Sequence, residues 1–234
     1  MSMRNASVAG IGTALILGAS PMPAEALVIM AMYDAGFNAA DKLVIDDAIA
    51  EWEARFSRSN HKITVNFVID NNLGDLGLTH GWNPDANGIP TNPTVTIDYN
   101  DHNWTLGAPA AGMNDALDTL KHEVGHAIGW TVLLPRFNAN VLTIMGNRFY
   151  DLNMNGAFDP GDFDLDDGGG THAVPGSGDL MAPTTPLGQR HHPTHLHALV
   201  LQKAFGYVPE PATLLLMLGG LLGFGRFVRR PLSP

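Results

Sequence analysis

The sequence contains no cysteine among its 234 residues. This absence excludes a disulfide framework and any metal site with cysteine ligands, so a transition metal would have to be held by histidine, aspartate or glutamate. Basic side chains are also scarce, because 13 lysines and arginines stand against 23 aspartates and glutamates, a formal charge of −10. That balance argues against nucleic acid as a partner and is typical of an exported protein or of one that binds divalent cations.

The chain has no internal repeats, and its length suits one domain of moderate size with tails. Its N-terminal end predicts a secretory signal. Arg4 supplies a positive start, residues 8–18 form a short apolar run, and residues 24–26 read AEA, an A-x-A site that predicts cleavage after Ala26. The alternative is a buried N-terminal helix, which two prolines just before the cleavage site disfavour.

The C-terminal end has three parts: residues 208–211 read VPEP, residues 212–225 are apolar, and arginines follow at 226, 229 and 230. The apolar run is short for a bilayer span, which needs about 20 residues, and the arginines should stay cytoplasmic. This end resembles the PEP-CTERM sorting signal of Gram-negative bacteria. The resemblance implies export, transient anchoring in the inner membrane by a transmembrane segment, cleavage by an exosortase, and release to the cell envelope or the extracellular matrix. An ordinary tail anchor is the alternative.

These two ends predict a signal peptide over residues 1–26, one folded domain over 27–208 and a sorting signal over 209–234. Without the four arginines and two glutamates of the ends, 9 basic and 21 acidic side chains remain. The folded domain would therefore have a formal charge of −12, which is unsuited to polyanions.

Residues 114–130 carry His122, Glu123 and His126 in the pattern H-E-x-x-H. Leucine, valine and isoleucine recur along this stretch at helical spacing, with Asn114 as the expected N-cap. On a helix, residues four apart share a face, so the two imidazoles can bind one metal ion while Glu123 reaches a metal-bound water. The alternative is that the two histidines only cover a helix face.

The surrounding pattern predicts an α+β fold. Alternating or continuous apolar runs predict strands, and apolar residues three and four apart predict helices. Strands are expected at 27–32, 62–69 and 94–99 with a short edge strand at 78–82, helices at 38–56 and 195–205, and an irregular acidic, glycine-rich loop at 150–170.

A catalytic zinc site needs three protein ligands and one open position. No glutamate lies between Glu123 and Glu210, which excludes a downstream glutamate as the third ligand. Gly129 follows His126 as it does in H-E-x-x-H-x-x-G-x-x-H, but Val132 stands where that pattern has its last histidine. The third ligand must therefore lie farther along the chain. The candidates are His172, His191, His192, His195, His197, Asp164 and Asp179.

His172 stands in the segment THAVPGSGDLMAP, with Met181 nine residues after it. Together with the H-E-x-x-H stretch, this segment resembles the leishmanolysin-like metzincins, in which an insertion separates the glycine from the third histidine. The resemblance implies a zincin-like (metzincin) domain: a twisted mixed sheet with an active-site helix, followed by an irregular C-terminal subdomain with a final helix. It also implies that His122, His126 and His172 bind zinc, that Glu123 is the base and that Met181 forms the Met-turn. The chain departs from that group in having Ala173 where a tryptophan is common, and in lacking disulfides.

The acidic loop fits the calcium-loop pattern, with oxygen-bearing side chains at positions 1, 3, 5, 9 and 12 and glycine at position 6. The predicted calcium ligands are Asp151, Asn153, Asn155, the carbonyl of Ala157, Asp159 and Asp162. No helix is expected before Asp151, so the pattern predicts a single loop site and no paired EF-hand. A bound cation would order the insertion that leads to His172. The alternative is a solvated turn.

These features predict an exported zinc endopeptidase that hydrolyses a protein or peptide substrate through a zinc-activated water, with Glu123 as general base. Two alternatives remain: a non-catalytic matrix or surface protein that retains a zincin fold and a calcium loop, and a metal-dependent hydrolase that acts on another bond.

Overall fold

The computed structural model describes residues 27–56, 61–99, 102–166 and 171–207. The predicted signal peptide and sorting signal lie outside the described residues. Within these ranges, no helix has both the length and the apolar character that crossing a membrane requires.

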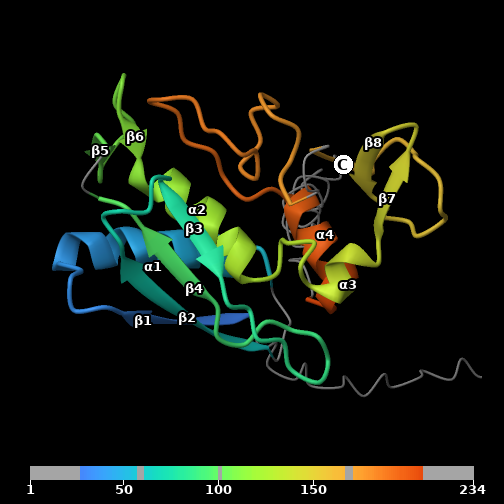
Figure 1. The fold of residues 1–234 in the computed structure, drawn as a ribbon, viewed down its shortest axis with the longest axis horizontal. Helices are drawn as coiled ribbons and strands as arrows, with labels where there is room; N and C mark the ends of the chain where they lie inside the picture. The colour runs from blue at the N-terminus through green and yellow to red at the C-terminus, as the bar shows by residue number, and fades with distance from the viewer. Residues whose placement is uncertain (1–26, 57–60, 100–101, 167–170, 208–234) are drawn as a thin grey trace, which may run out of the picture.

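A four-stranded sheet forms the first half of the fold (Figure 1). Its strands lie in the order β1 (Val28–Tyr33), β2 (Lys62–Ile69), β4 (Thr94–Ile97) and β3 (Gly77–His80). β1, β2 and β4 are parallel, whereas β3 runs antiparallel to β4 and forms an edge of the sheet. The expected mixed sheet with a short edge strand is therefore present, and the fold class is α+β.

Two helices cover one face of this sheet, α1 (Ala39–Glu53) and α2 (Ala116–Ala127). Alternation along β2 buries Ile63, Val65 and Phe67 on the covered face. Asn38 caps α1, because its side chain accepts hydrogen bonds from the backbone N–H groups of Ala40 and Asp41.

α2, the helix of the H-E-x-x-H pattern, is buried along its whole length. It begins one residue later than expected, because the predicted N-cap Asn114 is wrong and Asp115 has that role. Asn114 and Asp115 form the short strand β6, which pairs with β5 (Trp104–Thr105), and Asp115 is the cap that accepts the Asp118 N–H at 2.9 Å. The helix ends before Gly129, whose φ of +123° suits glycine and where a Cβ would lie 2.4 Å from the Phe205 ring.

The second half contains α3 (Pro135–Asn138), a three-stranded antiparallel sheet of β7 (Val141–Ile144), β8 (Asn147–Tyr150) and β9 (Phe163–Leu165), and α4 (His195–Phe205). The final helix is confirmed, with Thr194 as its cap. The expectation of a loop throughout 150–170 is wrong at β9, which pairs with β8. This half is ordered by those pairings and by α4, which packs on the core through Val200, Leu201 and Phe205.

Candidate metal centre

Three histidines from distant parts of the chain meet beside α2. His122 and His126 lie one turn apart on α2, and His172 lies beyond β9. One ring nitrogen from each histidine lies within 4.8 Å of the others, a grouping that could hold a metal ion. The ring centroids are 4.6 Å, 5.3 Å and 5.0 Å apart. The structure therefore brings together the three side chains that the sequence had singled out.

Backbone pairing returns His172 to the helix. Ala173 forms an antiparallel bridge with Leu165 of β9, and the Asp166 N–H donates to the His172 carbonyl at 2.9 Å. The Ala173 N–H in turn donates to the Met181 carbonyl at 2.8 Å. His172 is thus held between β9 and the turn at residue 181. No local sequence pattern predicts these backbone pairings.

The two helix histidines are held in a defined tautomer. The Nδ1 of His122 lies 2.7 Å from the Leu180 carbonyl oxygen, and the Nδ1 of His126 lies 2.5 Å from the Trp130 carbonyl oxygen. A carbonyl only accepts, so each Nδ1 carries a proton and each Nε2 presents a lone pair. This arrangement, with one ring nitrogen donating to a carbonyl, is the usual way in which a protein orients a metal-binding histidine.

The two free Nε2 atoms face each other at 3.0 Å. Two lone pairs at that distance repel each other unless a cation lies between them. Nitrogens bound to one tetrahedral zinc ion at 2.0–2.1 Å are separated by roughly 3.3 Å. The pair therefore stands close to the separation that one shared zinc ion requires.

Burial keeps all three rings neutral, the form that binds metal. It lowers the pKa of His122 and takes that of His126 well below its usual range. It also lowers the pKa of His172 to about 4, and the neighbouring His122 adds to that shift. At neutral pH the cluster thus offers three lone pairs with no proton to displace.

Glu123 lies beside this cluster under the edge strand. Its carboxylate accepts a hydrogen bond from the Thr79 hydroxyl at 2.7 Å, and a Cβ at Gly77 would lie 2.8 Å from its Cγ. Burial raises the pKa of Glu123 to about 7, although the Thr79 bond opposes the shift. Thr79 is a residue that the sequence did not reveal, because its position in a short edge strand carries no signal of a partner 44 residues away.

A cleft of about 520 Å³ opens over the histidines and Glu123. β3 and the loop before it form one rim, and residues 182–185 form the other. Trp82 and His102 line it as well, and the Trp82 indole N–H donates to the His126 carbonyl at 2.7 Å. The residues that line the cleft come from both halves of the fold.

Met181 packs beneath α2, where the resemblance placed the Met-turn. A Cβ at Gly125 would lie 2.7 Å from the Met181 sulfur, so the helix has no side chain at this point. Met181 is fully buried.

The other candidate ligands have different partners. His191 pairs with Asp118 at 3.3 Å, His192 with Glu51 at 2.8 Å and His197 with Asp179 at 2.9 Å, whereas His195 is exposed. Within the described ranges, the three-histidine cluster is the one group of histidine and acidic side chains with metal-binding geometry.

The acidic loop between β8 and β9 is tightly hydrogen-bonded around its carboxylates. Asp151 accepts the backbone N–H of Met154 at 2.6 Å and of Gly156 at 2.8 Å, and Asp162 accepts the Leu152 N–H at 2.9 Å. The side chains of Asn153 and Asn155 both donate to Asp159, which lowers its pKa. The predicted calcium ligands thus lie in one compact loop, which follows a strand and no helix.

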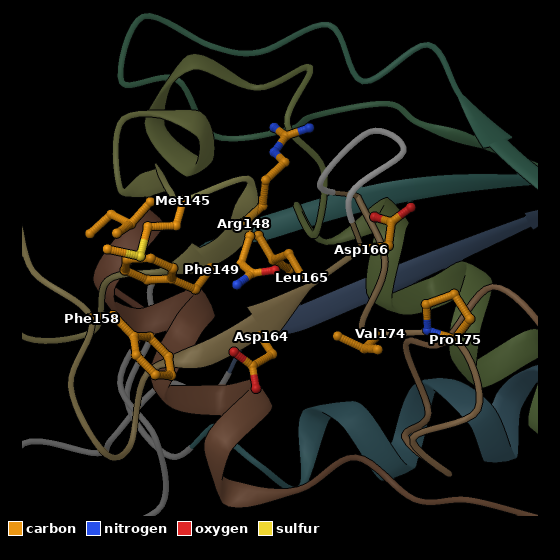
Figure 2. A pocket seen from close by; sticks show the side chains of 11 residues that line it. Met145, Arg148, Phe149, Phe158, Asp164, Leu165, Asp166, Val174 and Pro175 are labelled. Carbon is orange, nitrogen blue, oxygen red and sulfur yellow. The ribbon is translucent and has the colours of Figure 1, made fainter.

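A second cavity, of about 440 Å³, is lined by residues of β8 and β9 and by Val174 and Pro175, which follow the His172 segment (Figure 2). Met145, Phe149, Phe158 and Val174 give it apolar walls. Asp164, a candidate ligand by sequence, lines this cavity and is not part of the histidine cluster. None of the three histidines lines it, so the possible metal-binding cluster belongs to the cleft and not to this cavity.

Comparison with known proteins gives two findings. Residues 208–230 match the PEP-CTERM protein-sorting motif. Among solved structures, the chain is similar to high choriolytic enzyme 1, a hatching-enzyme zinc protease of the medaka fish Oryzias latipes, at 13% identity and a TM-score of 0.36 over 77% of this chain and 90% of that one. No curated protein matches the sequence. A likeness at that identity and TM-score does not establish a function. The histidine cluster is the feature of the molecule that points to one, and the sorting motif is the one family feature that is identified.

Proposed function

We propose that this protein is an exported zinc-dependent endopeptidase of metzincin-like architecture. The observation that carries the proposal is the facing pair of unprotonated Nε2 atoms on His122 and His126, 3.0 Å apart, with His172 beside them. Two buried, neutral imidazoles whose lone pairs face each other, with a half-buried third imidazole beside them, are costly unless a cation compensates them.

Zinc is the metal that fits this donor set. Three imidazoles with an open fourth position are a catalytic zinc arrangement, and the chain has no thiolate that would favour a structural site. His122, His126 and His172 would hold the ion. When bound, zinc lowers the pKa of a water molecule to about 7 and stabilises negative charge on a carbonyl oxygen.

Glu123 supplies the general base. Its carboxylate is fixed by Thr79 at the edge of the cleft, and a pKa of about 7 lets it accept a proton from water and release it at neutral pH. The proton accepted at Glu123 is then delivered to the amine that leaves as the peptide bond breaks. The two helix histidines take no part in proton transfer, because burial and their contacts with the Leu180 and Trp130 carbonyls hold their protons on Nδ1.

The cleft favours an extended peptide as substrate. β3 pairs with β4 on one side only, and its residues from Gly77 to Thr79 form a rim of the cleft. The open edge of a strand pairs readily with an extended chain. A polypeptide lying along β3 would pass directly over Glu123 and the histidines.

Export and anchoring complete the proposal. Residues 27–208 form the protease domain, residues 1–26 direct export, and residues 209–234 anchor the protein transiently in the inner membrane until an exosortase-type enzyme cleaves near the sorting motif. The mature domain would then reside in the cell envelope or outside the cell.

Calcium binding by the acidic loop is a separate part of the proposal. The Asp151 carboxylate already accepts the N–H of the glycine at position 6, and Asp162 lies against the start of the loop. A cation held by these side chains would reinforce the link between β8 and β9, and β9 is the strand that pairs with Ala173 beside His172.

Zinc analysis combined with a peptidase assay tests the function. The protein over residues 27–208 is expected to contain one zinc per chain and to hydrolyse casein, and Glu123→Gln is expected to retain the zinc while kcat falls by about 10²–10⁴-fold. His195→Ala, at an exposed histidine outside the cluster, is the matched control and should keep both properties. Stoichiometric zinc without hydrolysis by the unsubstituted protein would favour the non-catalytic surface protein.

A further inference from the structure

The turn at residues 179–181 contacts two of the three histidine segments. The Leu180 carbonyl accepts the Nδ1–H of His122 at 2.7 Å, and the Met181 carbonyl accepts the N–H of Ala173, next to His172, at 2.8 Å. Asp179 shapes the turn, because its Oδ1 accepts the Met181 N–H at 2.7 Å. The position of this turn therefore affects the orientation of one ring and the placement of another.

His197 of α4 contacts this turn through the side chain of Asp179. Its side chain is fully buried, and its Nε2 lies 2.9 Å and 3.0 Å from the two carboxylate oxygens of Asp179. The other ring nitrogen, Nδ1, accepts the Thr194 N–H at 2.9 Å in the capping box of α4. Because Nδ1 is an acceptor, the ring proton is on Nε2 and is donated to Asp179.

The His197 ring also packs against Trp130, the residue whose carbonyl orients His126. The His197 ring lies 5.4 Å from the ring of Trp130 in an edge-to-face arrangement, and the Trp130 carbonyl accepts the Nδ1–H of His126. Phe163 and Trp52 surround His197 at 5.7 Å and 6.0 Å. His197 thus contacts Asp179, in the turn that supports His122 and the segment of His172, and Trp130, whose carbonyl supports His126.

We propose that His197 is a positioning residue for the zinc site, acting through Asp179 and the 179–181 turn. The inference rests on the proposed function, since it concerns the affinity of the histidine cluster for zinc. Residues that orient metal-binding histidines typically change metal affinity by about 10–100-fold when they are substituted. Sequence alone placed His197 among the rival zinc ligands, whereas its contacts assign it to the support of the ligands.

Substitution of His197 by glutamine or by asparagine distinguishes its contact with Asp179 from its contact with Thr194. The side chain of Gln can donate to Asp179 but does not reproduce the ring acceptor for Thr194, whereas Asn can accept from Thr194 but is too short to reach Asp179. His197→Asn is therefore expected to weaken zinc binding about tenfold in competition with a chelator, and His197→Gln to stay within about threefold of the unsubstituted protein. Thr194→Ala, which removes the cap hydroxyl and leaves the Asp179 contact, is the control for lost helix stability.

A second readout does not require metal. In the zinc-free protein, the Nδ1–H of His122 should give a slowly exchanging ¹⁵N-coupled proton signal in NMR because it is bonded to the Leu180 carbonyl. His197→Asn should lose this signal, and His197→Gln and Thr194→Ala should keep it.

The inference is overturned if His197→Asn binds zinc as tightly as the unsubstituted protein, or if Thr194→Ala weakens zinc binding equally, since affinity would then follow stability alone. An unsubstituted protein that binds no zinc would refute the proposed function instead. In that case the metal-free NMR signal would still decide whether His197 positions His122.

Discussion

Replacing Glu123 by glutamine should stabilise the metal-free protein even though it strongly lowers the turnover of the zinc-loaded protein. The carboxylate is 6% exposed, and its burial raises its pKa from 4.5 to about 7. A folded protein with this raised pKa binds more protons than the unfolded chain between pH 4.5 and 7. Its stability therefore falls as the pH rises through that window, and the loss is complete above about pH 7.

The size of the effect follows from the pKa difference. A shift of about 2.5 units corresponds to about 3 kcal/mol of unfolding free energy at pH 8, which is an upper limit. For a domain of this size that is about 6–12 °C in Tm. Glutamine has nearly the same shape, carries no charge and can still accept the bond from Thr79, so it removes the cost of the buried charge without opening a cavity.

The assay is thermal unfolding of the chelated protein and of Glu123→Gln at several pH values from 4 to 8.5. The difference in Tm should be near zero at pH 4 and should grow to its maximum by pH 8. The three histidines also make stability depend on pH, but they are present in both proteins and cancel in the difference. Asp164→Asn, at an exposed aspartate, should give a flat difference. If Glu123→Gln also gives a flat difference, Glu123 is not a buried, raised-pKa base.

Three further predictions concern the cluster, the base and the loop. His172→Ala should lose zinc and casein hydrolysis, while His195→Ala keeps both. A fully zinc-loaded His172→Ala would show that His172 is not a zinc ligand. Thr79→Val should move the acidic limb of the kcat–pH profile to a pH about 1 unit higher, because the hydrogen bond that lowers the pKa of Glu123 is lost, whereas Thr79→Ser should leave the limb in place. An unmoved limb in Thr79→Val would show that Thr79 does not affect the pKa of the base. Calcium should raise the Tm of the unsubstituted protein and not of Asp151→Ala, and equal responses would leave the loop without a calcium site.

Much of the first half of the fold could be predicted because its signals are local. β2, α1 and the histidine pair on α2 depend on periodicity or on spacing within a few residues. The start of α2 was misplaced because Asn114 and Asp115 both suit an N-cap. The pairing of β6 with β5, which is a tertiary contact, selects the second of them.

The second half depends on contacts that the sequence does not encode locally. β9 spans three residues in an acidic stretch and exists because it pairs with β8. His172 could be named as a candidate ligand by elimination and resemblance, but its return to α2 depends on the Leu165–Ala173 bridge and on the 179–181 turn. His197 could not be distinguished from a ligand, because its partner Asp179 is 18 residues away and on no shared element.

The most direct test of the central claim is an anomalous difference map at the zinc edge from crystals of the protein over residues 27–208. The account predicts one strong peak at about 2.0–2.1 Å from a ring nitrogen of each of His122, His126 and His172, with Glu123 beside it. A zinc peak bound elsewhere, or coordinated by the two helix histidines while His172 points away, would contradict it.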